Sequence, residues 1–204
     1  MMISMEFRYT KDAIYIENKV LTKLDKFVIN FMDMVNKYCN YVIISGYIPI
    51  LFGRTRGTED VDVFIEHVDK KMFVNFYNNL IRGGYYFLNP EDENGLYEML
   101  TDKLGIRAAK KDTIVPNVEM KFIKDDIDLF TLKNHVKVIL NKKFNFFISP
   151  IEIEIPYKLY LGSEKDIEDA IYLWDIFQES VNKKLMNRFM NELKVSGEQY
   201  GIKI

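Results

Sequence analysis

Apolar residues in the first third of the chain change from a helical to a strand spacing. Over residues 18–39 they recur in steps of three and four, which predicts an amphipathic helix. A continuous apolar run at 41–45 and an alternating one at 60–65 predict two short strands. Between them we expect a short helix at 47–52 and a loop, while residues 5–16 have the pattern of an irregular or extended entry.

The middle of the chain carries further strand patterns and two helices. Asp69 is expected to cap a helix that ends at Gly83 and Gly84, and residues 96–104 have a weak helical pattern. Strands are predicted at 85–88, 106–110, 117–123, 136–140 and 144–148, with a hairpin joining the last two.

The pattern becomes mainly helical near Ser149. Two stretches, Ser149–Glu152 and Ser163–Asp166, fit a capping box, and Pro156 is expected to kink or restart the first helix. Further helices are expected to about residue 178 and over 181–193. We therefore predict an α/β (α+β) fold with a small mixed sheet, made of a core domain at 1–148 and a C-terminal helical section at 149–204 packed on it.

Composition limits the class of protein. The chain has 204 residues, of which 48% are hydrophobic and 28% charged, with a net charge of -2. This balance is typical of a globular protein and argues against one that binds nucleic acid over its whole surface. The single cysteine, Cys39, excludes an intramolecular disulfide and a thiolate metal cluster. Because no apolar run approaches a membrane span and residues 1–11 lack a signal-peptide core, we expect a cytoplasmic protein without membrane contact.

Two aspartates on one predicted strand are the main candidates for chemistry. Asp60 and Asp62 are two residues apart, so their side chains share a face of the strand. Adjacent carboxylates repel one another unless a cation lies between them, and Mg²⁺ or Mn²⁺ prefers such oxygen ligands. Arg54 and Arg56 precede them in a loop and are suited to an anion that the same metal binds. The pattern predicts a metal–nucleotide site.

The order of these motifs also carries a family resemblance. Ser45-Gly46 after a strand, Asp60-x-Asp62 on the next strand and Glu119 on a later one form a pattern that resembles the DNA polymerase beta-like nucleotidyltransferase superfamily. The chain is more closely similar to small prokaryotic members related to abortive-infection nucleotidyltransferase toxins. Lys158-Leu159-Tyr160-Leu161-Gly162 and Lys165-Asp166-Ile167-Glu168-Asp169 match a downstream segment of those proteins.

The resemblance implies a nucleotidyltransferase fold and a metal-dependent transfer of a nucleoside monophosphate from an NTP such as ATP. Asp60, Asp62 and Glu119 would hold the metal, and Glu119 would alternatively take the proton of the attacking hydroxyl. Ser45 and Gly46 would seat the phosphates. The acceptor would be a hydroxyl or phosphate of tRNA, a protein or a small molecule, and a toxin role would imply an antitoxin partner.

The remaining candidates come from the loop and the downstream segment. The resemblance implies that Lys158 lies near the nucleotide and takes part in catalysis, and that Asp169 contacts the nucleotide. Arg54 and Arg56 are candidates for phosphate binding, and Thr58 for orienting Asp60 or capping the loop.

Several alternatives stay open at this point. Asp126 and Asp128 are rivals of Glu119 for the third carboxylate, because Glu stands where the superfamily more often has Asp, and Ser45 and Gly46 are in reversed order. Lys158 would otherwise be a surface lysine, and Asp169 would form an ordinary helical pair with Lys165. The alternative function is a nucleotide-binding or partner-binding module without catalysis. An RNA-binding protein is a third possibility, which the net charge disfavours.

Overall fold

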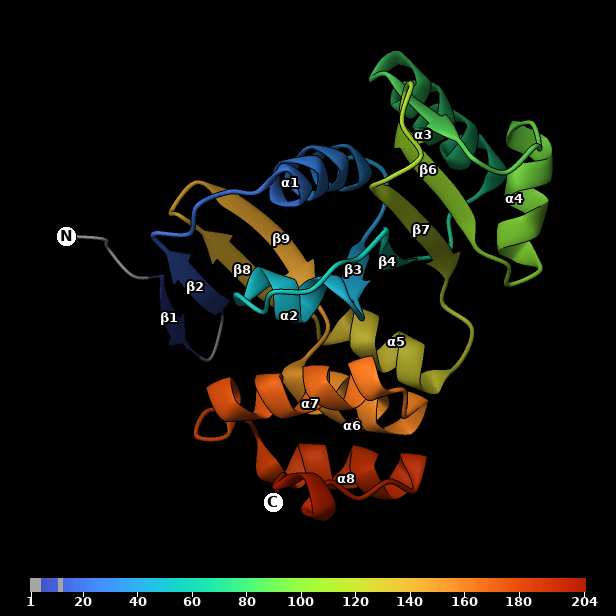
Figure 1. The fold of residues 1–204 in the computed structure, drawn as a ribbon. Helices are drawn as coiled ribbons and strands as arrows, with labels where there is room; N and C mark the ends of the chain where they lie inside the picture. The colour runs from blue at the N-terminus through green and yellow to red at the C-terminus, as the bar shows by residue number, and fades with distance from the viewer. Residues whose placement is uncertain (1–4, 11–12) are drawn as a thin grey trace.

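One mixed sheet of nine strands runs through the residues described by this computed structural model, 5–10 and 13–204 (Figure 1). The strands are β1 (Glu6–Tyr9), β2 (Ala13–Glu17), β3 (Tyr41–Ile44), β4 (Asp60–Ile65), β5 (Tyr85–Phe87), β6 (Ile106–Lys110), β7 (Asn117–Phe122), β8 (Val136–Leu140) and β9 (Phe144–Ile148). Their order across the sheet is β1-β2-β8-β9-β3-β4-β7-β6-β5. The pairs β2–β8, β3–β9 and β4–β7 are parallel, and the other neighbours are antiparallel.

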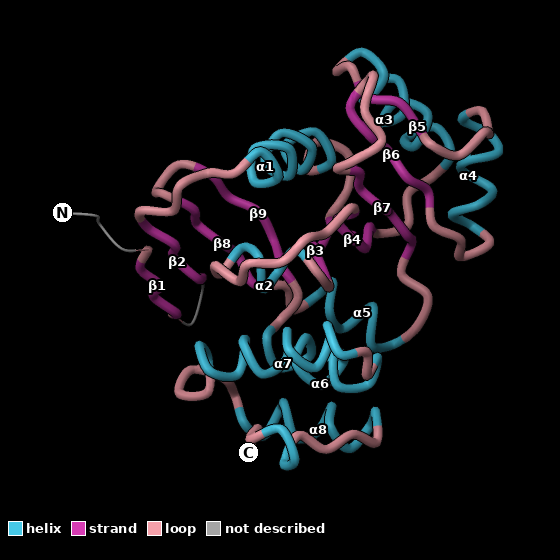
Figure 2. The backbone as a smooth tube through the Cα atoms, in the orientation of Figure 1, coloured by secondary structure: helices cyan, strands magenta, loops and turns pink. Residues whose placement is uncertain are grey.

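Helices cover both faces of this sheet (Figure 2). They are α1 (Lys23–Val35), α2 (Tyr47–Leu51), α3 (Lys70–Arg82), α4 (Glu93–Thr101), α5 (Asp126–Lys133), α6 (Ile151–Leu161), α7 (Glu164–Phe177) and α8 (Lys183–Leu193), followed by the 3-10 turn η1 (Glu198–Tyr200). Helices α1, α3 and α4 pack on one face, whereas α5 packs on the other beside the C-terminal helices α6, α7 and α8. Among the helices of the described residues, none combines the length and the hydropathy needed to cross a membrane.

Strand alternation decides which residues enter the core. Along β4 the residues Val61, Val63 and Ile65 are buried in the main hydrophobic core, and the residues between them face the other side. The same alternation holds along β7, where Val118 and Met120 are buried. Because the register is fixed by this burial, the polar residues of β4 and β7 all come to the face that α5 and α6 border.

A buried carboxylate joins the start of α1 to α2. Asp25 has no exposed surface, and it accepts hydrogen bonds from Lys19 Nζ at 2.8 Å, Tyr47 Oη at 2.9 Å and the backbone N–H of Thr22 at 2.9 Å. Burial opposes ionisation, but the bonds from Lys19 and Thr22 outweigh it and lower the pKa of Asp25. Since Tyr47 is the first residue of α2, this network fixes the turn that precedes it.

Most predicted elements are confirmed. The strands at 60–65, 106–110, 136–140 and 144–148 have the predicted bounds, and the last two form the predicted antiparallel hairpin. The expectation of a small sheet is wrong, because the entry expected to be irregular or extended contains β1 and β2, which extend the sheet to nine strands. The first helix is also shorter than 18–39, since Thr22 caps it with both bonds of a capping box.

Local chemistry explains the other differences. Helix α5 was not expected, yet Asp125 caps it by accepting a bond from the Asp128 N–H at 2.9 Å. The capping box predicted at Ser149 does not form, because Pro150 occupies the cap position of α6 without a side-chain bond. Pro156 neither breaks nor restarts α6, which runs on to Gly162, a residue in the left-handed conformation as expected for a helix end.

Asp25→Asn tests the network at the start of α1. The substitution leaves Lys19 buried without its anion, so we expect a loss of about 3 kcal/mol or more in the free energy of unfolding. The matched control is Asp33→Asn on the same helix, because Asp33 pairs with Lys37 while both side chains are exposed. Urea unfolding should place the control within about 0.5 kcal/mol of the wild type. Equal stability of the two variants would contradict a structural role for Asp25.

Candidate active site

A row of polar residues crosses three neighbouring strands on the face opposite the main core. Asp62 of β4 lies opposite Glu119 of β7, and Glu119 lies opposite Arg107 of β6. Asp60 lies on the same face as Asp62, two residues earlier on β4. Burial and the charge of Asp60 raise the pKa of Asp62, although the Ser45 side chain lowers it by hydrogen bonding. Two carboxylates are thus held side by side at a cost that a bound cation would relieve.

The predicted third carboxylate, that of Glu119, is already paired with positively charged side chains. Glu119 accepts a hydrogen bond from Arg107 Nε at 2.8 Å and forms an ion pair with Lys121. These partners outweigh burial and lower the pKa of Glu119. Arg107 Nη2 also lies 3.9 Å from Asp60 Oδ2. Sequence analysis missed Arg107, because its place beside Glu119 follows only from the antiparallel register of β6 and β7.

The turn between β3 and α2 lies beside this row. Ser45, its first residue, has a φ of +63°, a conformation uncommon for residues other than glycine. Gly46 follows, and a Cβ at this position would come within 3.1 Å of Arg56 Nη2, so the guanidinium lies directly against the turn. Thr58 Oγ1 donates a hydrogen bond of 2.9 Å to the Asp60 carbonyl, which fixes the loop where β4 begins.

The remaining predicted residues meet at Asp169, which has no exposed surface. Lys158 Nζ lies 3.0 Å from Asp169 Oδ2 and 2.9 Å from Asp166 Oδ1. Arg54 and Arg56 both pair with Asp169 as well. The interpretations of Lys158 as a surface lysine and of Asp169 as a partner of Lys165 are therefore wrong, because both side chains are buried in one ion cluster.

The rival carboxylates lie on α5. Asp126 is exposed in its first turn, whereas Asp128 is 6% exposed and accepts a hydrogen bond from the Lys124 N–H at 3.1 Å. Beside Asp128 is Glu154 of α6, which sequence analysis missed. Glu154 is 3% exposed, and its Oε1 has no hydrogen-bond partner among the described residues. Burial raises the pKa of Glu154 to about 7, an effect that Lys158 opposes and the charge of Asp62 reinforces.

Comparison with solved structures found similar folds. JHP933 from Helicobacter pylori matches with a TM-score of 0.50 and 16% sequence identity, over 81% of this chain and 72% of that one. An antigenic nucleotidyltransferase-like protein from Paracoccidioides brasiliensis matches with a TM-score of 0.48 and 18% identity, over 81% and 83% of the two chains. No protein-family model and no curated protein matches the sequence. The similarity to JHP933 supports a shared mixed α/β fold, and at this identity it concerns the fold alone.

Asp169→Asn tests the ion cluster. The amide leaves Arg54, Arg56 and Lys158 without their shared anion, so we expect a loss of about 3–5 kcal/mol in the free energy of unfolding. Glu168→Gln is the matched control, because Glu168 pairs with Arg54 from a side chain that is 57% exposed. Its effect should stay within about 0.5 kcal/mol in the same urea titration. A mild effect of Asp169→Asn would show that the cluster does not hold the loop.

Glu154→Gln tests the buried carboxyl through the pH dependence of stability. The pKa of Glu154 is raised from 4.5 to about 7 in the folded protein, so the unfolded chain loses this proton first as the pH rises. Ionisation of Glu154 therefore lowers the free energy of unfolding. This loss is absent at pH 4 and complete above pH 7, where it reaches about 3 kcal/mol.

We therefore expect Glu154→Gln to match the wild type at pH 4 and to unfold at higher urea concentrations at pH 8.5. Glu164→Gln, which replaces an exposed glutamate, should change the free energy of unfolding by no more than about 0.5 kcal/mol at either pH. A variant as stable as the wild type at both pH values would mean that Glu154 ionises freely.

Proposed function

We propose that this protein is a metal-dependent nucleotidyltransferase that moves a nucleoside monophosphate from an NTP to an acceptor hydroxyl or phosphate. The observation that carries the proposal is the placement of Asp60 and Asp62 on one face of β4, beside the Ser45-Gly46 turn and the Arg56 guanidinium. Carboxylates for a metal and a cation for phosphate are the two elements that transfer from an NTP requires.

The two aspartates are suited to Mg²⁺ or Mn²⁺. Mg²⁺ is commonly held by one or two carboxylates while substrate phosphates and water complete its shell. Asp60 and Asp62 supply such a pair, and their mutual repulsion, seen in the raised pKa of Asp62, is relieved by a divalent cation. When bound, the metal would neutralise charge on the phosphates and on the departing pyrophosphate.

Arg56 is the proposed phosphate ligand. One of its terminal nitrogens pairs with Asp169, and the other lies against the Gly46 turn. A planar guanidinium held on one side in this way presents its other N–H groups in a fixed direction, as phosphate binding requires. We assign Lys158 and Asp169 a positioning role, because Lys158 contacts Asp169 and Asp169 in turn contacts both loop arginines.

Glu119 is the proposed third acidic residue. Its lowered pKa keeps it ionised, which suits charge balance or metal binding better than abstraction of a proton. In the transfer itself, the acceptor oxygen forms a bond to the α-phosphorus while the bond to the β-phosphate breaks. Pyrophosphate leaves with that electron pair, and the proton of the hydroxyl is released.

One observation favours the second candidate, a nucleotide-binding module without catalysis. Within residues 5–10 and 13–204, no three or more histidine, cysteine, aspartate or glutamate side chains are arranged to hold a metal ion. Glu119 is itself paired with Arg107 and Lys121. Such a module would be stabilised by NTP with Mg²⁺ but would release no pyrophosphate with any acceptor.

Asp62→Asn distinguishes the two functions. Purified protein is incubated with Mg²⁺ or Mn²⁺ and each α-labelled NTP, together with total RNA, total protein or a metabolite extract. We expect the wild type to label one pool and Asp62→Asn to reduce the label by at least about 100-fold, because a metal ligand is lost. Urea unfolding should show no loss of stability, since the substitution removes a repelled charge.

Asp33→Asn serves again as the control and should label as the wild type does. Wild-type labelling by Asp62→Asn would overturn the assignment of the metal site. If NTP binds but no pool is labelled, the module without catalysis becomes the better description.

A further inference from the structure

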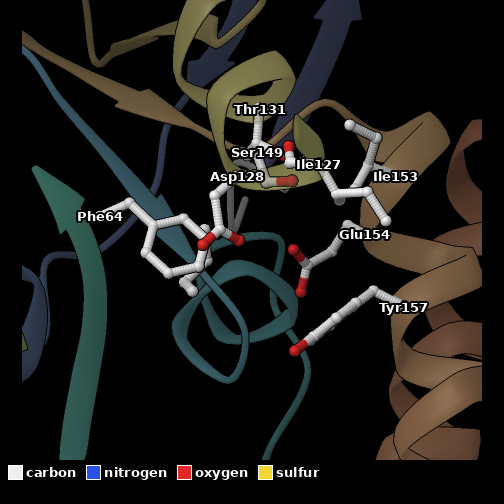
Figure 3. A pocket seen from close by; sticks show the side chains of 9 residues that line it. Phe64, Ile127, Asp128, Thr131, Ser149, Ile153, Glu154 and Tyr157 are labelled. Carbon is white, nitrogen blue, oxygen red and sulfur yellow. The ribbon is translucent and has the colours of Figure 1, made fainter. Parts of the chain in front are cut away.

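The polar face of the sheet is closed on one side of the aspartate pair and open on the other. Towards α5 and α6 it leaves a cavity of about 20 Å³, which has room for about one water molecule. Figure 3 shows that the carboxylates of Asp128 and Glu154 are directed into this narrow space. Towards β7 and β6, the side chains of Lys121 and Arg107 keep 40% and 50% of their surface exposed. A ligand larger than water beside Asp62 therefore has room on the β7 side and not on the α6 side.

Both oxygens of Glu119 hold a cation on this open side. Oε2 accepts hydrogen bonds from Nε and Nη2 of Arg107, the former at 2.8 Å, and Oε1 pairs with Lys121. The backbone at Gly105 confines the carboxylate further, because a Cβ there would come within 2.6 Å of Oε1. Nη1 of Arg107 has no hydrogen bond in the described part of the chain, so its N–H groups are free for a ligand.

The open side carries more positive than negative charge. Strand alternation and register place five side chains of β6 and β7 on this face: Arg107, Ala109, Asn117, Glu119 and Lys121. Two of them are cations and one is an anion, so the excess is one positive charge. Nη2 of Arg107 is 3.9 Å from Oδ2 of Asp60, which brings this excess next to the proposed metal site. An anionic group is the ligand that such a surface attracts.

The direction of the transfer reaction decides which substrate group meets this surface. The acceptor oxygen forms its bond to the α-phosphorus while the bond to the β-phosphate breaks, with the two oxygens roughly in line. Pyrophosphate takes the electron pair of the broken bond, and the hydroxyl proton is released to solvent. Arg56 and the Ser45-Gly46 turn, which are proposed to seat the departing phosphates, lie on the β3 side of the aspartates. The acceptor then approaches from the opposite side, where Arg107 lies.

We propose that Arg107 and Lys121, held by Glu119, bind a phosphate group of the acceptor and thereby select a phosphorylated alcohol. A guanidinium fork and an ammonium group together suit phosphate oxygens, which accept hydrogen bonds from several directions. The acceptor role rests on the proposed transferase function, whereas the binding of the phosphate group does not. A small phosphate ester and a nucleic-acid chain both present this group, and the experiment distinguishes them.

Binding is measured without turnover. The protein is mixed with Mg²⁺ and the four α,β-methylene NTP analogues, which fill the phosphate turn but cannot transfer a nucleotide. Ligand-detected NMR titrations then follow ribose 5-phosphate and, as its neutral analogue, ribose. We expect ribose 5-phosphate to bind at least about tenfold more tightly than ribose, because only the ester pairs with the two cations. Equal binding of the two compounds would overturn the proposal.

Variants locate the phosphate group. Arg107→Gln and Lys121→Gln should each weaken the binding of ribose 5-phosphate, the former at least about tenfold, because the guanidinium fork is lost. Arg82→Gln, an exposed change in the last turn of α3, should leave binding unchanged. Wild-type binding by Arg107→Gln or by Lys121→Gln would overturn the assignment of that residue.

A third ligand identifies the source of the phosphate. A single-stranded RNA pentanucleotide that binds more tightly than ribose 5-phosphate would identify a nucleic-acid chain as the acceptor. A pentanucleotide that binds no more tightly would identify a small phosphate ester. In both cases the proposal requires that Arg107→Gln removes the binding, and a complex that persists in this variant would contradict it.

The labelling assay separates this inference from the proposed function. With the acceptor that takes the label, Arg107→Gln should raise the KM of the acceptor at least about tenfold and leave the Kd of the NTP within about twofold. Unchanged acceptor kinetics in Arg107→Gln, with transfer abolished by Asp62→Asn, would overturn the inference and leave the transferase function standing. Weaker NTP binding with an unchanged acceptor KM would place Arg107 on the side of the leaving group and would also overturn it. Phosphate binding through Arg107 without transfer to any acceptor would instead refute the transferase function and support the phosphate site.

Discussion

The arrangement of the site depends on one buried charge, that of Asp169. An unpaired carboxylate without solvent contact would be strongly unfavourable, so Asp169 requires the cations that surround it. Those cations come from two other segments, Arg54 and Arg56 from the loop before β4 and Lys158 from α6. The cluster therefore joins the loop, α6 and α7 through contacts that hydrophobic packing alone would not specify. It also sets the position of Arg56 against the Gly46 turn, on which the phosphate-binding proposal relies.

The carboxylates along the polar face of the sheet differ in how completely partner groups compensate their charge. Glu119 is saturated by Arg107 and Lys121, Asp62 has the partial support of Ser45, and Glu154 has an oxygen with no partner. The pKa directions follow the same order, lowered at Glu119 and raised at Asp62 and Glu154. The carboxylates are thus less and less compensated by partner groups from β7 towards α6. A divalent cation at β4 is the ligand that this distribution would attract.

The sequence predicted the parts of the site that follow from local rules. The two-residue period of a strand placed Asp60 and Asp62 on one face, and Gly83 and Gly84 marked a helix end. Arg107 and Glu154 were beyond those rules, because their neighbours are set by strand register and by helix packing between distant segments. One signal for Glu154 was present, since it precedes Lys158 by four residues and so shares its helical face. That spacing would have linked both residues to the site had Pro156 not been expected to kink or restart the helix.

The continuity of α6 through Pro156 has a functional consequence. Proline in the second turn removes one backbone donor, yet the helix persists, so Glu154 and Lys158 stay on one face with a turn between them. Lys158 can then bind Asp169 while Glu154 lies near Asp62. Replacing Glu154 with a neutral residue would stabilise the protein at neutral pH, so stability alone gives no reason for a carboxylate at this position. Buried ionisable groups that lower stability are concentrated at functional sites, and the carboxyl of Glu154 lies close enough to Asp62 to feel its charge.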